Sequence, residues 1–190
     1  NTIKIGTLEE LIAFANDVNV NGNGYSGKTV VLTADIDLNN MEWTPIGQTG
    51  ATQFQGTFDG NGHTIKFTNT VYDGGNYLAA FRFEADATVK DLTIDMSEAT
   101  TANNRFRAIS SSANLTVDGC TFIGNPAYTN TRAVIFGEGA GANVGNLEIS
   151  VTNSTFKDWN GDINLFRVDF FDQSEVGDTM YIKSIKLVKK

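Results

Sequence analysis

Apolar and polar residues alternate with a period of two through much of this chain, in short runs separated by turn residues. Residues 28–38 (KTVVLTADIDL) show the pattern most clearly, because every second residue from Val30 to Leu38 is apolar. Such alternation predicts a β-strand with one buried and one exposed face. Asp35 and Asp37 fall on the exposed face, where we favour solvated aspartates over a calcium site or an acid/base pair. The chain is therefore expected to be an all-β protein.

One segment departs from the period of two and predicts a helix. Residues 8–18 carry apolar residues at helical spacing, namely Leu8, Leu11, Ile12, Ala15 and Val18. This spacing is typical of an amphipathic helix. The preceding Thr7 and the following Glu10 match a capping box, in which the hydroxyl accepts an amide hydrogen bond and the glutamate reaches back.

Gly56 to Phe67 (GTFDGNGHTIKF) joins two short strand patterns through a tight turn. The turn residues from Asp59 to Gly62 tolerate positive φ angles. A calcium loop would need a bidentate glutamate downstream, which is missing, and a hydrolytic triad would need a nucleophile beside His63. We therefore interpret this stretch as a structural turn that sets a complete repeat unit.

Strand-like runs recur through the second half of the chain. One series is LAAF, FRAI and AVIF, at residues 78–81, 106–109 and 133–136, so that its members follow one another at nearly equal intervals. A second series is LTI, LTV and LEI, at residues 92–94, 115–117 and 147–149. The run VDGCTF at 117–122 returns as VTNSTF at 151–156. Recurrence at such intervals, in a chain built only from strands and turns, is typical of a solenoid.

These patterns together predict a parallel β-helix whose open end is covered by the helix at residues 8–18. Such a cover is needed because exposed strand edges invite aggregation. We expect one β-helix domain over residues 1–190, with an N-terminal cap at 1–27, rungs at 28–160, and a last rung or C-terminal cap at 160–190. A unit of about 30 residues would not bury a core of its own.

Composition narrows the range of partners. Fourteen Lys and Arg residues against 22 Asp and Glu residues give a net charge of −8, which argues against nucleic acid and anionic membrane surfaces. The sequence has no run of eighteen apolar residues, so we expect no membrane insertion. Cys120 is the only cysteine and is interpreted as a small buried hydrophobe. We expect neither a metal site nor a cofactor.

Arginines recur on the predicted outward faces and form the candidate ligand site. Period two places Arg82 with Glu84 and Arg167 with Asp169 outward, and Arg107 lies in the run between them. Rungs that stack in phase would align the arginines into a strip that donates bidentate hydrogen bonds to a glycan. The simplest interpretation is a set of exposed ion pairs, and catalysis is the third alternative.

Threonines are frequent on the predicted outward faces. We considered a flat ice-binding face, which needs paired T-x-T rows across the rungs. The relevant residues do not form such pairs in the sequence: Thr64, Thr93, Thr116, Thr121 and Thr155.

The first third of the chain carries a specific combination of motifs. After the helix come V-x-L-T-x-D-I-D-L at 30–38, W-T-P-I-G at 43–47 and G-T-F-D-G-N-G-H-T-I at 56–65. Over residues 3–68 this combination closely resembles bacterial cell-surface β-helix proteins related to the GLUG-repeat group. The resemblance implies a right-handed parallel β-helix, an extracellular location and a role in adhesion or glycan contact, with no catalytic residues. Residues 70–160 lack the glycine-bounded repeats of that group, which leaves their rung boundaries open.

The last part of the chain, from Trp159 to Leu187, looks like the closing strands of some carbohydrate-binding β-sandwich modules. We favour a last rung and cap for this segment.

We expect a non-enzymatic extracellular domain of a larger bacterial surface protein, monomeric, serving adhesion, glycan contact or as a spacer. Its expected partner is a glycan or another cell-surface ligand. The alternative is a carbohydrate-active enzyme, either a polysaccharide lyase or a glycoside hydrolase, or its accessory carbohydrate-binding module.

Overall fold

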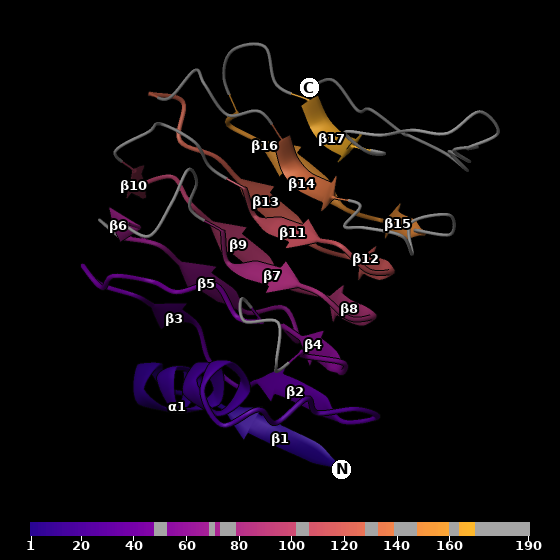
Figure 1. Cartoon of the computed structure of the whole chain (residues 1–190). Helices are drawn as coiled ribbons and strands as arrows, with labels where there is room; N and C mark the ends of the chain where they lie inside the picture. Colours follow the sequence, from indigo (N-terminus) through magenta and orange to yellow (C-terminus); the bar gives the residue numbers. More distant parts are fainter. Residues whose placement is uncertain are drawn as a thin grey trace, which may run out of the picture.

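Parallel strands stack into a right-handed β-solenoid of about four turns, with one short helix near the N-terminus of the described chain (Figure 1). The computed structural model describes residues 1–47, 53–68, 71–72, 79–101, 107–127, 133–138, 148–159 and 164–169. Each circuit of the chain around the solenoid is called a rung here; it passes from sheet A to sheet B and on towards sheet D, and two of the circuits also form a strand of sheet C. The predicted fold class, a right-handed parallel β-helix with a capping α-helix at its N-terminus, is confirmed.

Among the described residues, sheet A has six parallel strands; the first, β1, leads into the helix, and each of the other five begins a rung. Its strands are β1 (Thr2–Ile5), β2 (Thr29–Leu32), β4 (Thr57–Asp59), β8 (Ala87–Lys90), β12 (Leu115–Asp118) and β15 (Ile149–Thr152). The register is continuous across the sheet, so that residues at the same height in successive rungs face the same way.

Strands of the other three sheets complete the rungs, and sheet C has strands in two of them. Sheet B contains β3 (Ile36–Asp37), β5 (Thr64–Lys66), β9 (Thr93–Asp95), β13 (Thr121–Ile123) and β16 (Thr155–Lys157). Sheet C contains β6 (Val71–Tyr72) and β10 (Thr100–Thr101). Sheet D contains β7 (Phe81–Phe83), β11 (Ile109–Ser111), β14 (Ala133–Glu138) and β17 (Asn164–Asp169).

Inward-facing apolar residues form continuous columns along the solenoid axis. In sheet A, Phe58 pairs with Val30 on one side and Val89 on the other, and all three are fully buried. In sheet B, Ile65 and Ile94 form the corresponding column. Because every rung presents an apolar residue at the same height, burial of the core and strand register reinforce each other.

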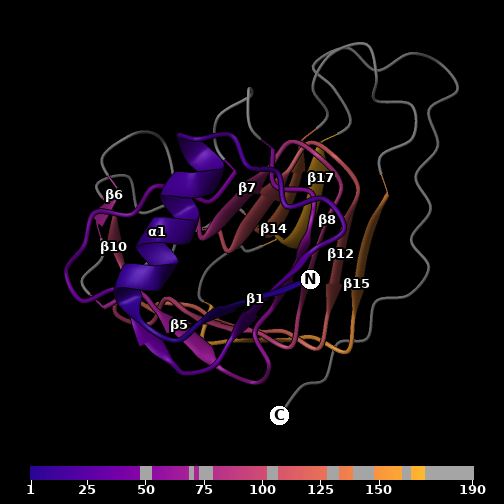
Figure 2. The ribbon, with the colours of Figure 1, turned by 90° about the horizontal axis from the view of Figure 1, so that it is seen from below.

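The helix α1 (Leu8–Asn19) covers the N-terminal end of the solenoid, as predicted (Figure 2). Its buried face consists of Leu11, Phe14, Ala15 and Val18. The Phe14 ring lies 5.1 Å from the Tyr25 ring and 5.7 Å from the Phe54 ring, both edge-on. The helix therefore packs directly onto the first aromatic residues of the core.

The capping box of α1 is formed by the predicted residues. Thr7 Oγ1 accepts a hydrogen bond from Glu10 N at 3.2 Å. The Glu10 carboxylate accepts from Gly6 N at 2.7 Å, one residue before the position that a standard capping box uses. The helix ends at Asn19, one residue beyond the predicted boundary.

The prediction of one strand over residues 28–38 is wrong. The chain forms β2 in sheet A and β3 in sheet B, with Thr33 to Asp35 turning the corner between them. Buried and exposed residues continue to alternate around this corner, because Leu32 and Ile36 are both buried while Asp35 and Asp37 are exposed. Alternation alone did not reveal a change of sheet.

The predicted repeats are confirmed in part. Thr121 pairs with Thr155, as the recurrence of VDGCTF as VTNSTF requires, and Phe81 pairs with Ile109, as the first series requires. Ile109 pairs with Ile135, one position before the partner that the first series predicts, Phe136.

The second series was grouped wrongly. Residues 93–94 belong to sheet B, whereas residues 115–117 belong to sheet A. The two runs therefore lie at different places in the rung, although both consist of a short apolar triplet around a threonine.

Gly56 to Phe67 forms the corner between sheets A and B in the second rung. Asn61 and Gly62 have φ angles of 50° and 82°, and Asp59 Oδ1 accepts from Asn61 N at 2.8 Å. A Cβ atom on Gly60 would lie 2.4 Å from Leu92 Cα of the next rung. The turn is thus structural, as interpreted from the sequence, and Gly60 permits close stacking of two rungs.

The C-terminal part of the predicted domain is described only as far as Asp169. There β17 pairs with β14 in parallel and continues sheet D. Residues 170–190, the remainder of the predicted last rung or C-terminal cap at 160–190, lie outside the described residues. No helix in the described part of the chain has the length and apolar character needed to cross a membrane.

Removal of the helical cap should expose the end of the core. We expect deletion of residues 7–18 to cause aggregation, and Phe14→Ala to lower the free energy of unfolding by about 3 kcal/mol through loss of its ring contacts. Size-exclusion chromatography and urea denaturation measure the two effects. A monomeric deletion variant that melts cooperatively would refute the role of α1 as a cap.

Two glycines of one corner should respond differently to the same substitution. Gly60→Ala places Cβ against the backbone of the next rung and should cost about 3 kcal/mol. Gly62→Ala meets no atom within 4 Å and should cost about 1 kcal/mol, from its positive φ alone. Chemical denaturation of both variants gives the comparison, and equal costs would contradict close stacking at Gly60.

Candidate functional site

Arg82 and Glu84 face outward from sheet D, as predicted. Both are partly exposed, while Phe81 and Phe83 are fully buried. The in-register row through Arg82 continues to Ser110, Phe136 and Arg167. Two other residues therefore separate the two arginines of this row, and the arginines do not form an unbroken ladder.

Arg107 lies two residues before β11 and packs onto the outer face of sheet D. Its guanidinium carbon is 3.7 Å from the Phe136 ring centroid, a cation–π geometry, and Nη1 is 3.4 Å from Ser110 Oγ. The side chains of Arg167 and Asp169 lie outside the described part of the structure. Ligand binding by Arg82, Glu84, Arg107, Arg167 and Asp169 stays a prediction.

Asp35, Asp37 and His63 link neighbouring rungs on sheet B. Asp35 Oδ1 accepts from Thr64 N at 2.9 Å and lies 3.2 Å from His63 Nδ1. Asp37 accepts from Asn39 N and from the Thr68 hydroxyl, each at 2.9 Å. The Thr64 amide, followed by His63, lowers the pKa of Asp35. Within the described residues, no three His, Cys, Asp or Glu side chains gather to hold a metal ion.

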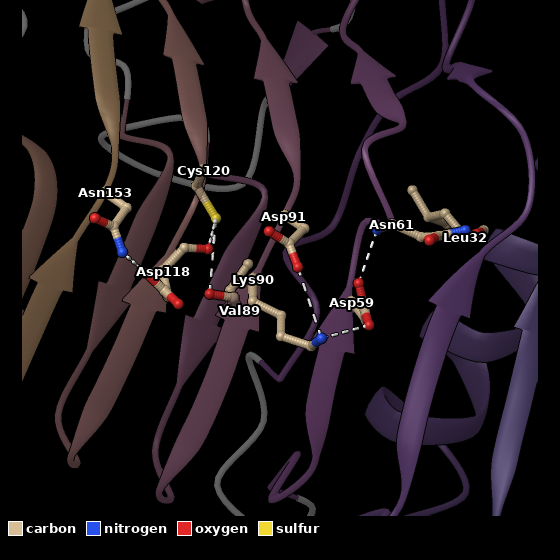
Figure 3. Close-up of polar contacts among 9 residues, drawn as sticks. All are labelled: Leu32, Asp59, Asn61, Val89, Lys90, Asp91, Asp118, Cys120 and Asn153. Atoms are coloured by element: carbon tan, nitrogen blue, oxygen red, sulfur yellow. Dashed lines mark hydrogen bonds and ion pairs between the residues drawn. The ribbon is translucent and has the colours of Figure 1, made fainter.

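A line of polar contacts crosses the corner between sheets A and B (Figure 3). Lys90 Nζ lies 2.8 Å from Asp59 Oδ2 and 3.6 Å from Asp91 Oδ2, and these contacts, with Asp59 first, raise the pKa of Lys90. Asp118 accepts from Thr152 Oγ1 at 2.7 Å and from Asn153 Nδ2 at 2.8 Å, which lowers its pKa. The contacts bind successive rungs to each other.

Cys120 belongs to the core side of the same corner. Its side chain is 1% exposed, and Sγ lies 3.7 Å from Val89 O and 3.5 Å from Asp118 O. Burial raises the pKa of the thiol to about 11, so the reactive thiolate is scarce at neutral pH. The interpretation of Cys120 as a small buried hydrophobe is confirmed.

A row of hydroxyl groups runs across sheet A, along the solenoid axis. The residues pair successively in parallel register: Thr2, Thr29, Thr57, Thr88, Thr116 and Ser150. All of them are at least partly exposed. No hydroxyl of this row forms a hydrogen bond with another described residue, so these groups are available to solvent or to a ligand.

A second row lies two residues upstream of the hydroxyl row, just before each strand begins. It consists of Gly27, Gln55, Asp86, Asn114 and Glu148, all exposed. Asp86 accepts from Asn114 N at 3.1 Å and from Asn114 Nδ2 at 3.3 Å. Asn114 Oδ1 in turn accepts from Glu148 N at 2.8 Å. These bonds fix the side chains of Asp86 and Asn114 along the axis.

The two rows enclose an open groove of about 450 Å³. Its remaining lining residues, which separate the two rows, are Lys28, Gly56, Ala87 and Leu115. The only cation among the described lining residues is Lys28, whose Nζ lies over the Tyr25 ring at 5.4 Å. Hydroxyls, amides and carboxylates thus dominate this groove, which we call the axial groove and take as the candidate binding site.

Sequence reasoning missed the axial groove because the rungs differ in length. The step from Thr57 to Thr88 is longer than the step from Thr29 to Thr57, and the step that ends at Ser150 is longer still, so no fixed period reveals the hydroxyl row. Thr116 belongs to sheet A, whereas the other four threonines considered for an ice-binding face align with one another in sheet B: Thr64, Thr93, Thr121 and Thr155. The two rows lie on different sheets, so they do not form the paired rows of a T-x-T face.

No protein-family model, curated protein or solved structure matches this chain. The relationship to the GLUG-repeat group therefore stays a prediction from the motifs in residues 3–68.

Acid should weaken the contacts between rungs. Hydrogen bonds from Thr152 and Asn153 hold the pKa of Asp118 below 3.8, and the Thr64 amide and His63 hold that of Asp35 below the same value. A lowered folded-state pKa gives stability that is present above pH 3.8 and is lost as pH falls through the folded value. Thermal melting from pH 7 to pH 2 should show this loss.

The variant Asp35→Asn/Asp118→Asn isolates the effect of these two carboxylates. It should melt at a lower temperature than the parent at pH 7, and its melting temperature should fall less than the parent's as the pH is lowered to 2. In a matched Glu9→Gln variant, on the exposed side of α1, the melting temperature should fall with pH as it does in the parent. Identical acid profiles for the parent and the double variant would contradict the assigned role of the aspartates.

Proposed function

We propose that this chain is a non-enzymatic glycan-binding domain of a bacterial surface protein and that it contacts polysaccharide through the axial groove. The carrying observation is the in-register row of hydroxyls with no protein partner among the described residues, beside a second row of amides and carboxylates. Polysaccharides are rich in hydroxyl donors and acceptors, which such rows satisfy by direct or water-mediated hydrogen bonds.

The contacts of Asp86 favour a binding role. Its carboxylate oxygens accept hydrogen bonds from Asn114 N and Nδ2, which hold the side chain in one orientation beside the hydroxyl row. A carboxylate held in this way can accept further hydrogen bonds from sugar hydroxyls.

The architecture supports a role at the cell surface. Each rung adds hydrogen bonds and core contacts to its neighbour, which gives a rod with an extended face. The resemblance of residues 3–68 to bacterial surface β-helix proteins favours an extracellular location and adhesion. A spacer role is compatible with the same rod and does not require the groove.

Loss of the groove hydroxyls should weaken glycan binding. The variant Thr57→Val/Thr88→Val/Thr116→Val keeps side-chain shape and strand propensity but removes three hydroxyls, so we expect affinity to fall by roughly tenfold. A glycan array identifies the ligands, and calorimetry on the strongest hit measures the change. The matched control is Thr64→Val/Thr93→Val/Thr121→Val in sheet B, which should bind as the parent does.

A third variant separates the two candidate surfaces. Arg82→Ala/Arg107→Ala/Arg167→Ala should retain binding if the axial groove is the site. Loss of binding in this variant alone would instead favour the strip of outward arginines that the sequence predicts. Release of sugar products from any polysaccharide on the array would overturn the non-enzymatic proposal in favour of a carbohydrate-active enzyme.

A further inference from the structure

We infer that the ligand of the axial groove is a linear, uncharged polysaccharide that lies parallel to the solenoid axis and contacts one hydroxyl of the protein per rung. This inference rests on the proposed function and adds the orientation, the length and the charge class of the ligand. Three features of sheet A carry it: the direction of the rows, their length and the charges beside them.

The direction of the bound ligand follows from the pairing of the strands in sheet A. Neighbouring residues of the hydroxyl row belong to different strands, so the row runs across the strands and along the stack of rungs (Figure 1). The upstream row of Gln55, Asp86, Asn114 and Glu148 is parallel to it. A ligand that follows both rows must therefore be extended, because a compact or branched sugar would reach only two or three rungs.

The length of ligand that the hydroxyl row can contact follows from the spacing of the strands. Parallel strands lie about 4.8 Å apart, so the four intervals from Thr29 to Ser150 span about 19 Å. Each rung adds one hydroxyl, and most rungs add one amide or carboxylate, so each rung offers a similar small increment of binding energy. Affinity should rise with oligosaccharide length until the ligand fills these five positions, and should then level off.

The charge class follows from the groove lining. Asp86 and Glu148 place two carboxylates in the upstream row. Lys28, the one cation among the described lining residues, offsets only one of these two charges. The whole chain carries a net charge of −8. A polyanion such as a polyuronate would meet repulsion at close range and over the whole surface, whereas an uncharged chain would meet only hydrogen-bonding groups.

The experiment compares oligosaccharide length and charge on the parent protein. Linear uncharged gluco-, xylo- and manno-oligosaccharides, from disaccharide to octasaccharide, are titrated by calorimetry beside galacturonate oligomers of equal length. We expect the affinity for at least one uncharged series to rise over the shorter lengths and to level off near a ligand length of about 19 Å. We expect no measurable binding of galacturonate oligomers.

Two variants test the assignment of the rows. Thr57→Val/Thr88→Val/Thr116→Val should flatten the dependence on length, while Thr64→Val/Thr93→Val/Thr121→Val in sheet B should leave it unchanged. Asp86→Asn/Glu148→Gln should make the binding of galacturonate oligomers measurable, because it removes both carboxylates of the groove. Circular dichroism and thermal melting verify that each variant is folded.

The outcomes separate this inference from the proposed function. Glycan binding that is independent of length, or that prefers the polyanion in the parent, would overturn the inference and leave glycan binding standing. Failure of every glycan to bind the parent would overturn both. Length-dependent binding that survives the triple substitution in sheet A would also overturn the inference, since it would place the ligand on another face.

Discussion

Parallel pairing of each rung with the next is the interaction on which the rest of the structure depends. The register in sheet A runs without interruption from β1 to β15, and each strand takes its partner from the preceding and following rungs. Because the pairing is parallel and in register, equivalent positions in successive rungs face the same way along the whole solenoid. Apolar residues inside become a core column, and polar residues outside become a row. The same in-register pairing of strands therefore produces both the core and the candidate site.

The fold was largely predictable from the sequence, because alternation and the capped helix are local signals. Val30, Leu32 and Ile36 were correctly assigned to the core even though the chain changes sheet between the last two. The sheet change itself was missed, since a corner that keeps the period of two looks like a continuous strand. The assignment of residues 92–94 to the same series as 115–117 failed for a related reason: short apolar triplets are alike in every sheet.

The candidate site was not predictable by the same means. Alternation with period two predicts that Arg82 and Arg167 face outward, but Arg82 and Arg107 do not align in one row. Nothing in the sequence indicates that Thr57 and Thr88 are neighbours in the structure, because the number of residues between paired positions varies from rung to rung. Only the three-dimensional register shows that ordinary threonines, two residues downstream of ordinary amides and carboxylates, form a continuous surface.

The unequal lengths of the rungs have a consequence for how such a surface can evolve. Insertions and deletions change the loops that complete a rung, but the distance between successive positions of the hydroxyl row stays the same, because peptide hydrogen bonds define it. Mutation therefore has no means of stretching or compressing the rows to suit a polymer with a different repeat. New specificity has to come from the identity of the side chain at each position of the row. Related domains would therefore differ in which side chains they present, while the spacing between those side chains would stay the same.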